Sequence, residues 1–163
     1  MRTFAAVFML MAGPASALSC MAPDVAETYL RADASEKIYV VVHGQIVFDE
    51  ARLPVTDWDR QENTPARTPI PAQMTGKSLG PGGFETPFQR AITLEVICAG
   101  PWCAGARSGG SVLAFVERSE AGYTLTLGPC GGDVFSPTPE VLATVQRCFE
   151  GEACVPQTGL LDQ

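Results

Sequence analysis

Apolar residues between positions 37 and 127 fall in alternating or continuous runs, and this pattern predicts a protein made mainly of β-strands. The first run, residues 37–50, is β-branched and aromatic on both sides of Gly44. It could form a hairpin around the glycine or one long strand bent there, and we favour the bent strand. Four more strands are expected, at residues 70–79, 88–98, 111–117 and 123–127.

Helical spacing of apolar residues predicts one helix before these strands and one after them. The first covers residues 23–34, with Pro23 suited to a first turn. The second covers about 139–149, with Thr138 as N-cap and Gly151 just past its end. Residues 51–69, 99–110 and 128–139 are rich in proline or glycine and are expected to be loops.

The order of a helix, five strands and a second helix fits the five-stranded OB-like antiparallel barrel with flanking helices. An antiparallel sandwich is the alternative. We expect a single domain over residues 18–154, followed by a flexible tail at 155–163.

The first residues are typical of a secretory signal: Arg2 is followed by an apolar stretch, a Gly-Pro break and Ala15-Ser16-Ala17. We predict that residues 1–17 are a signal peptide and that the protein is exported, to the periplasm or outside the cell. Cleavage after Ser19 would instead make Cys20 the first residue. A third possibility is that residues 17–20 form a lipobox and that Cys20 carries a lipid anchor.

All six cysteines follow the predicted signal. An even number of cysteines in an exported chain favours disulfides over catalytic thiols or metal ligands. Short separations favour pairing Cys98 with Cys103 and Cys148 with Cys154, which leaves Cys20 for Cys130. Other pairings are compatible with the sequence, so this connectivity is a hypothesis.

The chain has 11 basic and 18 acidic residues, a net charge of −7, and no run of lysine or arginine. This composition argues against nucleic acid as a partner, because nucleic-acid binding needs a basic face. After the signal, no stretch approaches the roughly 20 apolar residues that cross a bilayer, so an integral membrane protein is not expected. No cofactor or metal is predicted, and we expect a monomer.

His43 is the only histidine, so a hydrolase triad or a zinc site would have to use it. We interpret it as an ordinary strand residue; a periplasmic hydrolase that uses His43 with a loop carboxylate is the alternative. The acidic pairs Asp49-Glu50 and Asp57/Asp59 are interpreted as solvated loop charges.

Trp58 and Trp102 lie in the two loops that are the best candidates for binding a partner. A large aromatic residue in a loop either packs onto the core or stays exposed as a binding anchor, and we expect both tryptophans to be buried. The prediction is an exported, non-enzymatic binding module that uses its loops to bind a protein, with a protein of the cell envelope as the candidate, or another ligand. A purely structural envelope protein is a further alternative.

A family resemblance is carried by Cys20, by the strand at residues 40–46, by Pro101-Trp102-Cys103, and by the hairpin at 111–127 that leads to Cys130. On these residues the chain resembles bacterial members of the netrin-module and tissue-inhibitor-of-metalloproteinases superfamily. The resemblance covers about residues 20–130 and consists of spacing and hydrophobic pattern. It implies an OB-type barrel and, for a chain that starts at Cys20, a terminus that chelates a protease metal. The family's second N-terminal cysteine is replaced by Ala22.

Overall fold

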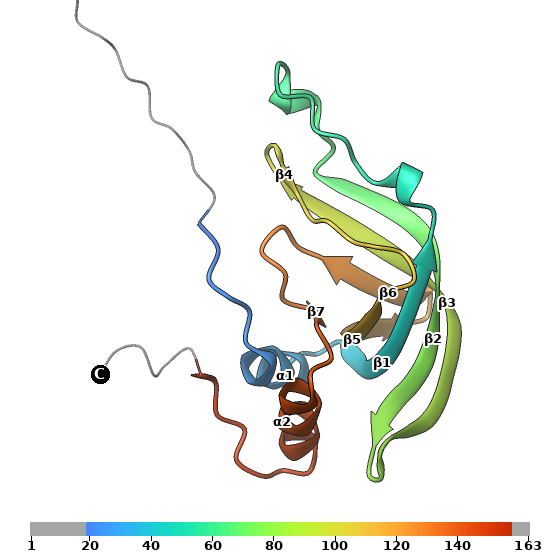
Figure 1. Ribbon diagram of the computed structural model, residues 1–163, viewed down its shortest axis with the longest axis vertical. Coiled ribbons are helices and arrows are strands. Elements are labelled where there is room, and N and C mark those ends of the chain that lie inside the picture. Colours follow the sequence, from blue (N-terminus) through green and yellow to red (C-terminus); the bar gives the residue numbers. More distant parts are fainter. Residues whose placement is uncertain (1–18, 158–163) are drawn as a thin grey trace, which may run out of the picture.

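Five strands pair into a closed ring at the centre of the molecule (Figure 1). The computed structural model describes residues 19–157; the predicted signal peptide and residues 158–163 of the predicted tail lie outside the described residues. From β1 the ring runs through β2, β3, β6 and β5 and back to β1. The ring strands are β1 (Ile38–Phe48), β2 (Arg67–Gly80), β3 (Gly83–Ala99), β5 (Ser111–Ser119) and β6 (Gly122–Leu127).

One pairing in the ring is parallel, that of β3 with β6, and the other four are antiparallel. The prediction of an antiparallel arrangement throughout is therefore wrong at this pairing. Because the ring has an odd number of strands, their directions cannot alternate all the way round, and one pairing must be parallel. The mainly β class, the five strand positions and the two flanking helices are confirmed for the described residues.

Strand β1 is continuous through Gly44, so the bent strand is confirmed and the alternative hairpin is excluded. Its first part, from Ile38 to Gln45, pairs with β5, and its later part, from Val42 to Phe48, pairs with β2. Gly44 lies opposite Gly76, and a Cβ atom on Gly44 would overlap the carbonyl oxygen of Thr75. The two strands thus come close only because neither glycine has a side chain.

Strands β2 and β3 are longer than predicted, since they begin at Arg67 and Gly83. Pro69 and Pro71 lie inside β2, although a proline usually ends a strand. At these two residues β2 pairs with β3 alone, because its pairing with β1 starts at Ala72. A strand edge without a partner tolerates residues that have no backbone N–H.

The predicted loops contain short regular elements that the sequence pattern did not indicate. The β1–β2 connection contains the 3-10 helices η1 (Glu50–Arg52) and η2 (Gln61–Asn63). The two-residue strand β4 (Trp102–Cys103) pairs with β3, and β7 (Val134–Phe135) pairs with β5.

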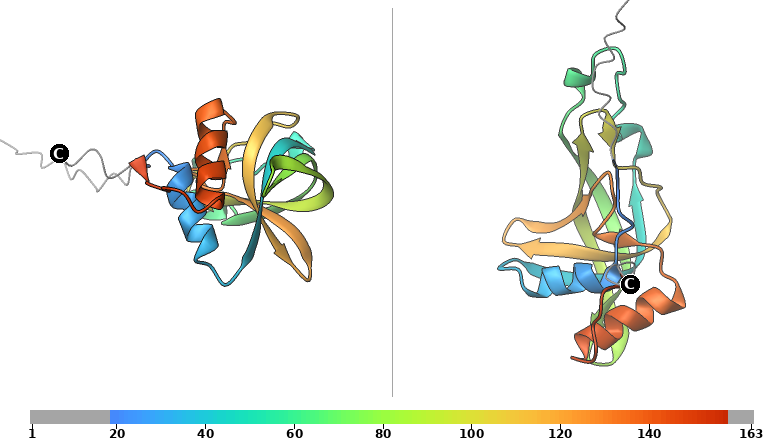
Figure 2. Two further views of the ribbon diagram at one scale, coloured as in Figure 1. Left: turned by 90° about the horizontal axis from the view of Figure 1, so that it is seen from below. Right: turned by 90° about the vertical axis from the view of Figure 1, so that its left-hand side faces the viewer.

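Two hydrophobic cores lie on the two sides of the ring wall. Helices α1 (Val25–Asp33) and α2 (Pro139–Phe149) lie together on one outer side (Figure 2). Strand β5 contributes to both cores, with Ala114 and Val116 inside the ring and Leu113 and Phe115 under the helices. The largest fully buried side chains of the inner core are Val42, Ile70, Met74, Leu94, Val96, Val116 and Leu125.

The helix ends follow local capping. Asp24 caps α1 by accepting a hydrogen bond from the amide of Glu27, so this helix begins two residues later than predicted. Thr138 caps α2 as predicted, and the bounds of α2 are the predicted ones. The amide of Gln157, in the described part of the predicted tail, donates to Asp24 at 2.9 Å. None of the described helices is long and apolar enough to cross a membrane.

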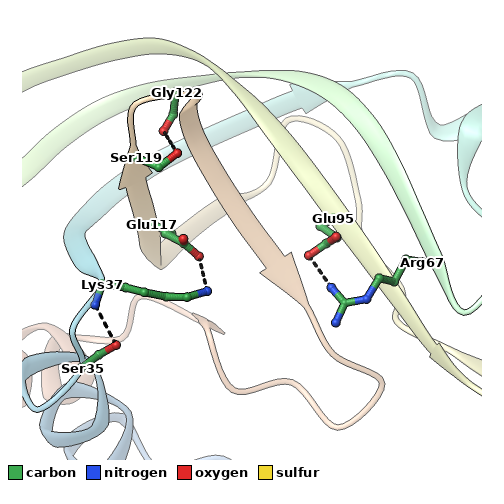
Figure 3. Close-up of polar contacts among 7 residues, drawn as sticks. All are labelled: Ser35, Lys37, Arg67, Glu95, Glu117, Ser119 and Gly122. Carbon is green, nitrogen blue, oxygen red and sulfur yellow. Dashed lines mark hydrogen bonds and ion pairs between the residues drawn. The ribbon is translucent and has the colours of Figure 1, made fainter.

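Two exposed ion pairs lie near the ring surface, one between β5 and the residue before β1, the other between β2 and β3 (Figure 3). The Lys37 ammonium donates to Glu117 at 2.9 Å, and the Arg67 guanidinium donates to Glu95 at 2.9 Å. The hydrogen bond that Lys37 donates to Glu117, and the negative charge of that carboxylate, raise the pKa of Lys37. Exposed pairs of this kind contribute little net stability, so the two cores and the disulfides carry the fold.

The three predicted disulfides are present, and the described residues contain no free cysteine. The Cys20–Cys130 disulfide joins residues 110 positions apart, linking the segment before α1 to the turn after β6. Cys98 and Cys103 lie opposite each other on β3 and β4. Cys148 and Cys154 join the end of α2 to the segment that follows it.

The contact of Gly44 with β2 can be tested with Gly44→Ala. We expect the free energy of unfolding, measured by urea denaturation, to fall by about 1–3 kcal/mol, because the added methyl group pushes β1 and β2 apart. Gly105→Ala is the matched control, since a Cβ there meets nothing within 4 Å; it should change stability by less than about 0.5 kcal/mol. Equal losses in the two variants would contradict the role given to Gly44.

The long disulfide should stabilise the fold more than the short one at the end of α2. Replacing both Cys20 and Cys130 by serine is expected to cost about 4–5 kcal/mol, because a long loop loses the most chain entropy when it is closed. The corresponding double serine variant of Cys148 and Cys154 closes a loop of separation 6 and should cost about half as much. Urea denaturation of both variants checks this, and a larger cost for the short bridge would refute it.

Candidate functional site

An open groove of about 560 Å³ lies where the N-terminal segment, the β1–β2 connection and the β3–β4 turn meet. The β1–β2 connection and β4 lie at one end of the molecule, away from α1 and α2, in the views of Figures 1 and 2. Three prolines, Pro54, Pro101 and Pro129, and the half-buried Trp102 line the groove, and Cys20 forms part of its wall. Prolines and disulfides restrict backbone motion, so the groove is held largely in shape without a ligand.

The β1–β2 connection is fixed to the ring at defined points. Asp49 caps η1 by accepting a hydrogen bond from the amide of Ala51, and Leu53 packs against the inner core. The hydroxyl of Thr56 donates to the carbonyl oxygen of Pro101 at 2.7 Å, and so joins this connection to the β3–β4 turn. The two loops that the sequence suggested as binding loops thus form one continuous surface.

The two candidate tryptophans differ in exposure. Trp102 is half-buried in the groove wall, whereas Trp58 is 64% exposed, so the prediction that Trp58 is buried is wrong. Trp58 follows Thr56 in the β1–β2 connection, and Thr56 is the residue that bonds to the β3–β4 turn. It sits in a turn closed by Asp57, whose carboxylate accepts from the amides of Asp59 and Arg60. That local network closes the turn on itself and leaves the indole without core contacts.

Sequence reasoning missed several residues of this surface. Val55 is 86% exposed beside the groove, and Met21, next to Cys20, is 82% exposed. Val55 is an apolar residue within the proline-broken loop 51–69, which is a signal that was present in the sequence, whereas Met21 stands between Cys20 and Ala22 and had no such signal. The bond from Thr56 to Pro101 had no such signal, because it joins residues that are 45 positions apart.

His43 lies away from the groove, on a strand of the ring. Its Nε2 atom is 3.5 Å from the hydroxyl of Ser111, and its ring lies edge-on to Phe84. In a catalytic triad, a carboxylate binds the histidine and orients it. Within residues 19–157, His43 has no hydrogen bond or ion pair with a carboxylate. The carboxylate of Glu50, which lies beyond the end of β1, accepts from the amide of Ser108 at 2.7 Å. The geometry therefore gives no support to the hydrolase alternative.

The described residues also contain no candidate metal site. Among the described residues, no three His, Cys, Asp or Glu side chains lie close enough together to hold a metal ion. Asp57 is joined to Arg60 in an ion pair at 3.1 Å. The end of the molecule that carries the groove, here called the groove end, has an exposed apolar and aromatic surface. The Asp57–Arg60 ion pair belongs to the same loop.

A comparison of the chain with protein-family models, curated proteins and solved structures gives no match.

Proposed function

We propose that the protein is an exported, disulfide-bonded binding module that holds another protein of the cell envelope at the groove end. The observation that carries the proposal is Trp58, which is 64% exposed on a loop fixed to the ring by Leu53 and Thr56. Exposed tryptophans on rigid supports are frequent anchors of protein interfaces, because they bury a large area at little entropic cost.

The surroundings of Trp58 support a protein partner rather than a small molecule. The groove is open, and the apolar side chains of Val55 and Met21 extend the exposed surface beyond it. Small-molecule sites are mostly enclosed clefts, whereas protein interfaces combine exposed apolar anchors with a polar rim. The ion pair of Asp57 and Arg60 provides polar groups at such a rim.

Export is supported by the leader pattern of residues 1–17 and by the three disulfides, which persist in an oxidising compartment such as the periplasm or the extracellular space. We also propose that the ring is an OB-type barrel of the netrin and TIMP kind. The long, bent first strand shared by two neighbours supports this, and OB-folds bind ligands through the loop between their first two strands. That loop here is the connection that carries Trp58.

A second candidate function is inhibition of a metalloprotease, as the family resemblance implies. The observation that favours it is the place of Cys20 in the groove wall beside Trp102 and Pro129. The amino group of Cys20 could reach a protease metal only in a chain that begins at this residue. A chain that begins at Leu18 has only the binding function.

The binding proposal predicts that Trp58→Ser loses the partner. We expect the wild-type protein, used as bait against the exported fraction, to retain one partner in a saturable complex. Trp58→Ser should bind it at least about tenfold more weakly, because an interface anchor contributes 2 kcal/mol or more. Val155→Ser is the matched control, since Val155 is 67% exposed and none of residues 150–157 lines the groove.

Equal binding by both variants, or no saturable partner, would overturn the proposal. N-terminal sequencing of the same exported protein decides the second candidate. A chain that starts at Cys20 and inhibits a zinc protease would support it, and a start at Leu18 would exclude it.

A further inference from the structure

A second hollow, of about 190 Å³, opens inside the ring at the end where β1 and β6 finish. Its inner lining is apolar and includes Ile46, Phe48, Leu94 and Leu127. These side chains belong to the inner core and are all less than 9% exposed. The hollow shares only Gly105 with the groove, so it is a separate feature of the molecule.

The hollow is left open at its mouth beside Gly105, because a Cβ there would meet no atom within 4 Å. Gly128 and Gly131 also line it, but a Cβ on Gly128 would lie 3.0 Å from the carbonyl oxygen of Gly131, and one on Gly131 would lie 3.3 Å from the ring of Pro23. Protein interiors are normally packed to near crystal density, and partly enclosed apolar hollows are where small ligands bind.

One wall of the hollow is the segment that leads into β5, and it is tied to β1. The amide of Gly109 donates to the carbonyl oxygen of Ile46 at 2.7 Å, and the amide of Phe48 donates to the hydroxyl of Ser108 at 3.0 Å. These bonds continue the contact between the two segments beyond the end of the strand pairing. This wall is therefore in place before any ligand arrives.

The opposite wall is the turn that follows β6. The Cys20–Cys130 disulfide, the hydrogen bond from the Thr28 hydroxyl to the carbonyl of Gly132, and the ion pair of Arg31 with Asp133 all hold it. A site with two fixed walls loses little conformational entropy on binding, which favours affinity.

The charge at the mouth selects the kind of ligand. Asp133 lines the hollow, but Arg31 lies 2.7 Å from its carboxylate and neutralises it. Arg107 also lines the hollow and is exposed, and within the described residues its side chain makes no hydrogen bond or ion pair. The charge left available is therefore positive, in a protein whose net charge is −7.

We propose that this hollow binds a small amphipathic carboxylate, with its apolar part inside the ring and its carboxylate at Arg107. Arginine is the side chain best suited to pair with a carboxylate, through two parallel hydrogen bonds. A dry cavity of about 150 Å³ holds a benzene molecule, so this hollow takes a chain or ring of roughly six to eight carbons. The proposal does not rest on the protein-binding function, because the hollow and the groove are different surfaces.

The test is an NMR titration of the disulfide-bonded protein with octanoate and, separately, with 1-octanol. We expect saturable octanoate binding that shifts the amides of residues 105–107 and 126–134. Octanol should bind about tenfold more weakly, since it lacks the charge-assisted hydrogen bonds to Arg107.

Two variants separate the roles of charge and space. Arg107→Gln should weaken octanoate about tenfold and leave octanol unchanged, while Ala106→Leu should abolish binding of both by filling the mouth. Arg90→Gln is the matched control, because Arg90 is exposed on β3 and bonds only to the neighbouring carbonyl of Gln89. The proposal is overturned if octanoate does not saturate, if its shifts map to the groove around Trp102, or if Arg107→Gln binds octanoate as well as Arg90→Gln does.

Discussion

At Gly44 and Gly76 the backbones of β1 and β2 come closer than any side chain would allow, because a Cβ on either glycine would overlap the opposite strand. This close contact lets one bent strand pair with β2 along its later part and with β5 along its first part. Because β1 joins the two halves of the sheet in this way, the sheet closes on itself instead of leaving two open edges. The closed ring has an inside and an outside, and each side buries a hydrophobic core of its own.

Ring closure also determines where functional surfaces can lie. The outer face near β5 is covered by α1 and α2. The long loops lie at the end of the ring away from these helices. Segments outside the two hydrophobic cores are held by a disulfide and by a hydrogen bond. The Cys20–Cys130 disulfide secures the N-terminal segment, and the bond from Thr56 to Pro101 joins the two loops of the groove. Rigid loops of this kind suit recognition, because less entropy is lost when a partner binds.

The groove and the hollow differ in shape and therefore suit different ligands. The groove is open and carries Trp102, and the β1–β2 connection that lines it also carries the exposed Val55 and Trp58, which is the basis of the proposal that it binds a protein. The hollow is smaller and lined by core side chains, and Arg107 at its mouth has no ion-pair partner among residues 19–157, which is the basis of the proposal that it binds a small anionic amphiphile. His43, the residue on which any triad would depend, is in neither surface: it faces Ser111 and Phe84.

Features of this protein that depend on neighbouring residues could be predicted from the amino-acid pattern. Residue periodicity placed the five ring strands and both helices, Thr138 and Pro139 set the start of α2, and cysteine spacing indicated the three disulfides. Tertiary structure decided what depends on distant segments: the parallel pairing of β3 with β6, the prolines tolerated within β2, and the half-buried state of Trp102. It also decided that Trp58 stays exposed and that the ring is left unfilled near Gly105. None of these follows from neighbouring residues, because each depends on which distant backbone comes close enough to pair with, cover or fill a position.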